Sequence, residues 1–120
     1  MMEIAESKFG EIYVLRPCGR LDTNAASEAE KKLGELTDAA QVSLVVNMEK
    51  LEYISSSGLR VLLVALKKAR QRQGDIRLAC LQPLLKEELD IAGLTQLFKI
   101  FDAEDQAVSS FSLAGDPGVG

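Results

Sequence analysis

A run of three serines and a glycine, Ser55-Ser56-Ser57-Gly58, is the part of this chain whose residue types and spacing could do chemistry. The run follows a short apolar segment and precedes an unusually apolar helical pattern that begins at Leu59. Free N–H groups at the start of a helix, together with the helix dipole, favour an oxygen acceptor or an anion. Ser56 or Ser57 could therefore cap the helix, and a serine of the run could instead carry a phosphate. Residue spacing alone leaves both roles open.

Catalytic chemistry finds little support in the rest of the chain. The 120 residues include no histidine, which removes the commonest general base and metal ligand and excludes Ser–His–Asp and Cys–His constellations. Neither GxxxxGK[ST] nor GxGxxG occurs. The serine run also lacks the first glycine of a Gly-x-Ser-x-Gly nucleophile elbow. We therefore expect a binding protein that is not an enzyme and that uses no metal or cofactor.

Composition and charge limit the classes of partner and the cellular compartment that can be expected for this protein. Hydrophobic residues make up 47% of the chain and charged residues 27%, as in an ordinary globular domain, and the net charge of −4 argues against nucleic acid. No apolar run reaches the roughly 18 residues that span a membrane, and the first residues lack the apolar core of a signal peptide. Cys18 and Cys80 are expected to be buried, reduced thiols. These features predict a cytoplasmic protein that contacts neither nucleic acid nor membrane directly.

Hydrophobic periodicity predicts about five strands and about four helices. The expected strands are Glu3 to Lys8, Ile12 to Leu15, Val42 to Met48, Asp75 to Leu81 and Leu97 to Phe101, and Pro17, Cys18 and Gly19 are expected to end the second of them. The expected helices begin after caps at Asp22, Thr23 or Asn24, at Leu59 after a polar loop, at Pro83, and after Asp102. The order β-β-α-β-α-β-α-β-α predicts one α/β domain, residues 1–114, with a mixed, mostly parallel sheet. Residues 115–120 are expected to be a disordered tail.

Three segments of the chain resemble the STAS domain family, and specifically the bacterial anti-sigma-factor antagonists. Gly19-Arg20-Leu21-Asp22 is similar to the family's Gly-x-Leu-Asp after the second strand. Val45-Val46-Asn47-Met48 through Ser56-Ser57-Gly58-Leu59-Arg60-Val61-Leu62 resembles the family's strand, Asp-Ser-Ser-Gly loop and helix start. Ala92-Gly93-Leu94, followed by Phe98-Lys99-Ile100, is similar to its Gly-Leu and short final strand. The resemblance covers nearly the whole chain, from about Glu3 to Leu113.

The resemblance implies a partner-switching function. In this family the unmodified antagonist binds an anti-sigma factor that is also a serine kinase, and so frees a sigma factor. The kinase phosphorylates a loop serine, which breaks the complex, and a separate serine phosphatase reverses the modification. By position the phosphorylated residue is Ser56, with Ser55 and Ser57 as alternatives, and Ser57 would then be the helix cap. The implied partner surface consists of Asp22, Thr23, Asn24, Ser55, Ser56, Ser57, Gly58 and Leu59.

Ser55 stands where the family usually has aspartate, so one negative charge is missing beside the expected phosphorylation site. A second function also fits the resemblance, that of a constitutive STAS binding subunit of an ABC-type lipid transport complex. The two functions differ in one testable respect. An antagonist should lose its partner when Ser56 becomes negative, whereas a constitutive subunit should be indifferent to that charge.

Overall fold

The computed structural model describes residues 2–114, which form a single α/β domain. Its elements are β1 (Met2–Phe9), β2 (Ile12–Leu21), α1 (Thr23–Thr37), β3 (Ser43–Asn47), β4 (Leu51–Ile54), α2 (Ser56–Gln71), β5 (Asp75–Ala79), α3 (Pro83–Ile91), the 3-10 turn η1 (Leu94–Gln96), β6 (Lys99–Phe101) and α4 (Glu104–Ala114). The four predicted helices and the fold class are confirmed. The predicted tail, residues 115–120, lies outside the described residues. No helix within residues 2–114 is long and apolar enough to cross a membrane.

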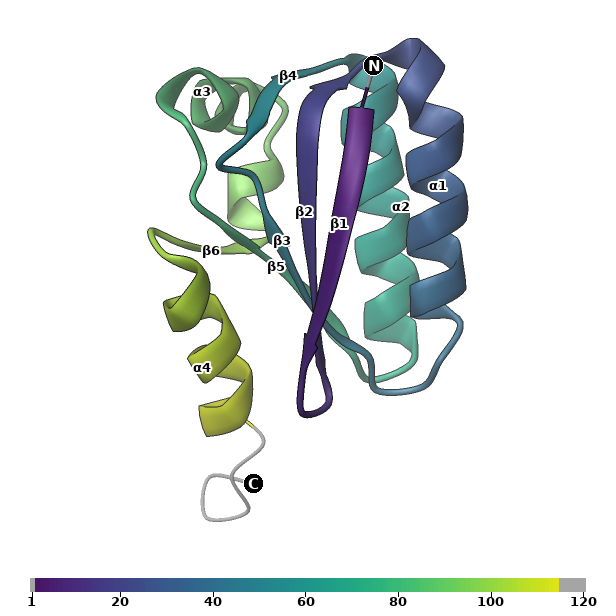
Figure 1. The fold of residues 1–120 in the computed structure, drawn as a ribbon, viewed down its shortest axis with the longest axis vertical. Helices are drawn as coiled ribbons and strands as arrows, with labels where there is room; N and C mark the ends of the chain where they lie inside the picture. The colour runs from purple at the N-terminus through teal and green to yellow at the C-terminus, as the bar shows by residue number, and fades with distance from the viewer. Residues whose placement is uncertain (1, 115–120) are drawn as a thin grey trace.

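The sheet has six strands in the order β1-β2-β3-β5-β6, with β4 paired to β2. Only β1 runs antiparallel, as one arm of a hairpin with β2, and the other pairings are parallel. Figure 1 shows α1 and α2 side by side on one face of the sheet and α4 on the other face. The mixed, mostly parallel sheet is therefore the one expected from alternating strands and helices.

Strand β4 is the main departure from the predicted elements. Residues 51–54 were expected to lie in a polar loop, but they pair in parallel with the end of β2, Gly19 with Leu51 and Leu21 with Ile54. Strand β2 nevertheless continues through Pro17, Cys18 and Gly19, so the prediction that these residues end the strand is wrong. The physical reason is that β1 stays paired along these residues, Ile4 with Pro17 and Glu3 with Cys18, while β4 pairs with β2 only from Gly19 onward.

Apolar side chains fill both sides of the central strand β3. Leu44 and Val46 belong to the main core, which lies between the sheet and the helix pair α1 and α2. Val45 points to the opposite face and packs with Ala107 and Phe111 of α4. Successive side chains of a strand point to opposite faces, so a strand covered on both sides has consecutive apolar residues, here Leu44 to Val46. The strand predicted at Val42 to Met48 is thus present, as β3, and is covered on both faces.

The two cysteines are not the buried pair that the sequence predicted. Cys18 is exposed, Cys80 is partly buried, and both thiols are free. Cys18 shares its face of β2 with Val14, which packs among the residues beneath α4. It lies nearer the end of the strand, in a part of that face that borders an open hollow. An apolar sequence context therefore did not ensure burial, because α4 covers only part of this face.

Candidate functional site

The serine loop lies at the end of the sheet where two parallel strands finish together. Leu21 of β2 is paired with Ile54 of β4, and each strand leads into a helix through a capping residue. The Asp22 carboxylate accepts a hydrogen bond from the Ala25 N–H at 2.9 Å. Ser55 Oγ accepts one from the Gly58 N–H at 3.1 Å. Helices α1 and α2 therefore begin at the same end of the sheet, as the top of Figure 1 shows.

The three serines have different surroundings. Ser55 is buried, with 8% of its surface exposed, and is the N-cap of α2. Ser56 is the first residue of the helix and is exposed, whereas Ser57 is partly buried. The prediction that Ser56 or Ser57 caps the helix is wrong, because α2 begins at Ser56, before the apolar pattern that starts at Leu59. The exposed hydroxyl of the run belongs to Ser56.

Gly58 allows α2 to start close against the ends of the two strands. A Cβ atom at this position would lie 2.7 Å from Leu21 Cγ, 2.9 Å from Ile54 Cγ1 and 3.0 Å from the Leu21 carbonyl oxygen. The Ser55 N–H donates a hydrogen bond to the same carbonyl oxygen at 2.8 Å. The loop is thus held on the strand ends by backbone bonding and by the absence of a side chain at residue 58.

An open hollow of about 410 Å³ lies between the first turns of α1 and α2. It is lined by Thr23, Ala26, Ser27 and Glu30 of α1 and by Ser56, Ser57, Arg60 and Val61 of α2. Of the residues predicted to bind a partner, Thr23, Ser56 and Ser57 therefore come together in one place. Asn24 is exposed outside this lining, Asp22 and Leu59 are partly buried, and Ser55 and Gly58 are buried.

Sequence reasoning missed the part of this lining that carries charge. Glu30 and Arg60 are its charged residues, and Ala26, Ser27 and Val61 are the other lining residues that were not predicted. Ser27 and Glu30 follow Thr23 by four and seven positions, and Arg60 follows Ser56 by four, spacings that place residues on one helix face. This spacing was readable in the sequence, but it gained meaning only once α1 and α2 were known to lie side by side.

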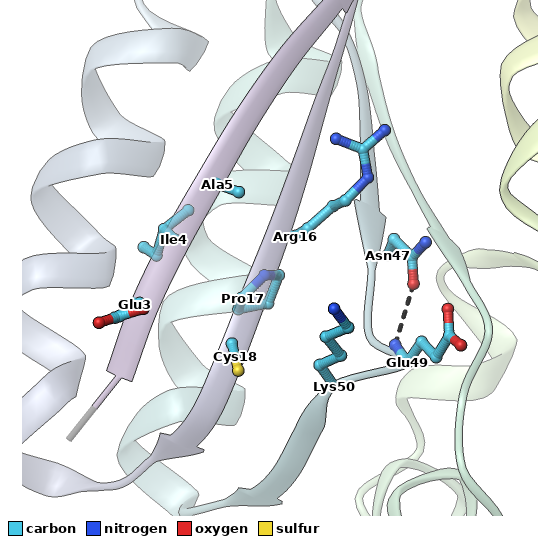
Figure 2. Close-up of a pocket in the computed structure, with 9 residues that line it drawn as sticks. All are labelled: Glu3, Ile4, Ala5, Arg16, Pro17, Cys18, Asn47, Glu49 and Lys50. Atoms are coloured by element: carbon cyan, nitrogen blue, oxygen red, sulfur yellow. Dashed lines mark hydrogen bonds between the residues drawn. The ribbon is translucent and has the colours of Figure 1, made fainter.

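A second hollow, of about 350 Å³, opens beside Cys18, with Glu3, Arg16, Asn47 and Lys50 among the residues around it (Figure 2). Two of its polar side chains, Arg16 and Asn47, hold α4. Arg16 donates two hydrogen bonds of 2.8 Å to Glu104, and Asn47 donates one of 2.9 Å to the same carboxylate. Asn47 Oδ1 in turn accepts from the Glu49 N–H at 2.9 Å, the dashed line of Figure 2.

The Arg16–Glu104 pair shifts the titration of both of its members. Hydrogen bonding to Arg16 lowers the pKa of Glu104, with a further contribution from Asn47, while burial acts in the opposite direction. The pKa of Arg16 is raised, chiefly by the same hydrogen bonding. We assign this cluster to the attachment of α4. Within residues 2–114 no group of three or more His, Cys, Asp or Glu side chains could hold a metal ion.

Comparison with known proteins agrees with this geometry. The family model of the STAS domain matches residues 4–107. A candidate anti-sigma factor antagonist, BtrV of Bordetella bronchiseptica, is 29% identical over 113 residues, which cover 94% of this chain and 97% of the relative. The anti-sigma F factor antagonist of Paenibacillus polymyxa is 25% identical over 103 residues, 85% of this chain and 88% of the relative.

Two solved structures, one of an unphosphorylated protein and one of a phosphorylated protein, have the same fold. The anti-sigma factor antagonist SpoIIAA in its unphosphorylated form superposes with a TM-score of 0.79 at 20% identity, over 92% of this chain and 96% of that one. SpoIIAA of Bacillus in its phosphorylated form superposes with a TM-score of 0.72 at 21% identity, over 91% and 99%. At these identities the likeness establishes the fold.

Proposed function

This chain belongs to the STAS domain family, and we propose that within it the protein acts as an anti-sigma-factor antagonist. It binds an anti-sigma factor in the cytoplasm and thereby frees a sigma factor, so that it regulates transcription without touching DNA. The observation that carries the proposal is the near full-length similarity to two relatives that bear this name. The role is that of a binding regulator and requires no catalytic group in this chain.

The proposed switch is phosphorylation of Ser56 by a serine kinase that is also the anti-sigma factor, reversed by a separate phosphatase. Ser56 is favoured over its neighbours by accessibility. Its side chain is exposed on the first turn of α2, whereas a kinase would have to release the Ser55 hydroxyl from its buried capping bond. Ser57 is partly buried. SpoIIAA, with the same fold, is known in a phosphorylated form, which is consistent with this proposal.

Phosphorylation would act through charge. A phosphate adds about −1.5 to −2 charges to a position that is neutral in the unmodified chain. The first turns of α1 and α2 and the hollow between them form the proposed partner surface. A charge buried or opposed in an interface costs several kcal/mol, and about 1.4 kcal/mol corresponds to a tenfold change in affinity. We therefore expect the modified protein to bind its anti-sigma factor at least about a hundredfold more weakly.

The proposal is tested by phosphosite mapping of the protein isolated from its own growing and starved cells. We expect phosphate on Ser56 in an amount that changes with growth state. Phosphate on Ser55 or Ser57 would keep the mechanism and move the site. Full coverage of the loop without modification in any state would contradict the switch.

A matched binding measurement uses Ser56→Asp, with Ser56→Ala as the uncharged control. The anti-sigma factor is first captured from the same cells and identified by mass spectrometry, and its affinity is then measured by calorimetry. Ser56→Ala should bind like the wild type, and Ser56→Asp should bind at least about tenfold more weakly. Equal binding by both variants would instead point to a constitutive binding subunit, such as that of a lipid transport complex.

A further inference from the structure

Arg60 is an exposed cation placed one helical turn after the proposed phosphorylation site. Residues four apart on a helix are neighbours, with Cβ atoms about 5–6 Å from each other. Ser56 and Arg60 both line the hollow between α1 and α2, so their side chains open onto the same space. The spacing places the guanidinium within reach of a group attached to Ser56 Oγ.

Arg60 also differs from the other arginines in having no partner among the described residues. Arg16, Arg70 and Arg77 form ion pairs, Arg72 donates to the Asp38 carbonyl oxygen, and Arg20 stacks on the ring of Tyr53. None of the ion pairs or side-chain hydrogen bonds within residues 2–114 engages Arg60. Its guanidinium is therefore available to a new anion.

We propose that Arg60 is the internal counter-ion of a phosphate on Ser56. This inference rests on the proposed function and names how the modified site is held. A guanidinium presents parallel N–H donors that match two oxygens of a phosphate, and such charge-assisted bonds are stronger than neutral ones. The phosphate would thus be fixed over the first turn of α2, between the free N–H groups of the helix start and the side chain of Arg60.

The pairing would change the partner surface in two ways at once. In the unmodified protein the charged residues of the hollow are Glu30 and Arg60, so its formal charge is −1 + 1 = 0. A phosphate brings this to about −1.5 to −2. It also holds the Arg60 guanidinium over Ser56, where it can no longer extend to an acidic group on a partner. The switch would therefore remove an accessible cation as well as add an anion.

The test is a phosphorus NMR titration of the full chain in which phosphoserine has been introduced at residue 56 during translation. A nearby guanidinium stabilises the dianion and lowers the second pKa of the phosphate. We expect Arg60→Gln to raise that pKa by a few tenths of a pH unit at low ionic strength, as is typical of exposed pairs at this spacing. Arg60→Lys should restore part of the difference.

Lys67→Gln is the matched control, because Lys67 is an exposed cation of the same helix that lies about 16 Å from Ser56 along the helix axis. It should leave the phosphate pKa unchanged. An equal pKa in wild type and Arg60→Gln, or an equal rise in both variants, would overturn the proposal. The titration needs no kinase, so a loop that is never phosphorylated in cells would contradict the proposed function and leave the result on Arg60 standing.

Discussion

Ser55 Oγ accepts a hydrogen bond from the Gly58 N–H at 3.1 Å, and this bond is the N-cap of α2. Ser55 stands where the family usually has aspartate, so one negative charge is missing at this position. Serine and aspartate are both strong N-cap residues, because each places a side-chain oxygen over the free N–H groups of the first turn. The replacement therefore removes the charge and keeps the cap.

The capping bond of Ser55 should contribute to the stability of the fold. Ser55→Ala should lower the free energy of unfolding by about 1 kcal/mol, because the Gly58 N–H loses its acceptor in a buried setting. Ser55→Asp should keep most of the stability, whereas Ser56→Ala, at an exposed position, should have little effect. Urea denaturation of the three variants measures this. A Ser55→Ala variant as stable as the wild type would show that the hydrogen bond contributes nothing.

Gly58→Ala should destabilise the protein although alanine is the better helix former. The added Cβ would lie 2.7 Å from Leu21 Cγ and 3.0 Å from the Leu21 carbonyl oxygen, and the backbone cannot easily move away. Overpacking of this kind costs about 1–3 kcal/mol.

Gly34→Ala provides the control for that substitution. Gly34 also lies inside a helix, but its added Cβ would meet nothing within 4 Å. This variant should gain about 0.5–1 kcal/mol from helix propensity. The midpoint of thermal denaturation should therefore be lower than that of the wild type for Gly58→Ala and higher for Gly34→Ala. A shift of the same sign in both variants would refute the proposed clash.

The Arg16–Glu104 pair makes stability depend on pH in the acid range. Since the pKa of Glu104 is lowered in the folded protein, the contribution of its ionised form is present above the ordinary carboxyl pKa and is lost as pH falls through the lowered value. Glu104→Gln should lower the free energy of unfolding by about 1–2 kcal/mol at pH 7 and should reduce the loss between about pH 5 and pH 3.

Glu87→Gln is the control for Glu104→Gln. Glu87 is an exposed residue of α3, so its substitution should alter neither the stability at neutral pH nor the slope of stability on acidification. Urea denaturation at a series of pH values compares the two variants with the wild type. An unchanged acid slope in Glu104→Gln would mean that the pair with Arg16 does not contribute to the pH dependence.

The two thiols should react at different rates with a thiol reagent at pH 7. Cys18 is exposed, whereas burial raises the pKa of Cys80, helped by the nearby charge of Glu49, and so reduces its reactive thiolate fraction. We expect the Cys18 thiol to react at least about tenfold faster than the Cys80 thiol. The fast phase should therefore be absent from Cys18→Ser and present in Cys80→Ser. A fast phase that survives Cys18→Ser would contradict this assignment.

The elements that could be predicted well from the sequence are those with a hydrophobic pattern that extends over many residues or with a distinctive composition. Helix α1 shows apolar residues at helical spacing, and β3 contains a run of apolar residues. Each could therefore be predicted from its own residues, without knowledge of the elements that pack against it. Strand β4 has only four residues, and its partner segment begins at Gly19, shortly after Pro17, where residue types are typical of a strand end. Its pairing depends on contacts between distant segments, which local patterns do not contain.

In the candidate site, too, some residues could be predicted from local patterns and others depend on contacts between distant segments. The serine run and the residues around Asp22 could be found from their types, and phosphorylation of the exposed Ser56 stays a prediction. The cap was misplaced because the apolar pattern begins three residues after the true start of α2. The spacing of Glu30 and Arg60 could be read from the sequence but pointed to no site, since an isolated charge on a helix surface is ordinary until a second helix is placed beside it.

The bond from the Ser55 N–H to the Leu21 carbonyl oxygen, 2.8 Å long, has a consequence for the thermodynamics of recognition. Fixing the backbone of one residue costs about 1–2 kcal/mol of conformational entropy. For the serine loop this loss occurs during folding, when Ser55 joins the end of β2. A partner therefore meets a preorganised surface, and its association need not order the chain on this side. Such an interface can form rapidly and can be weakened by a change of charge while the loop keeps its shape.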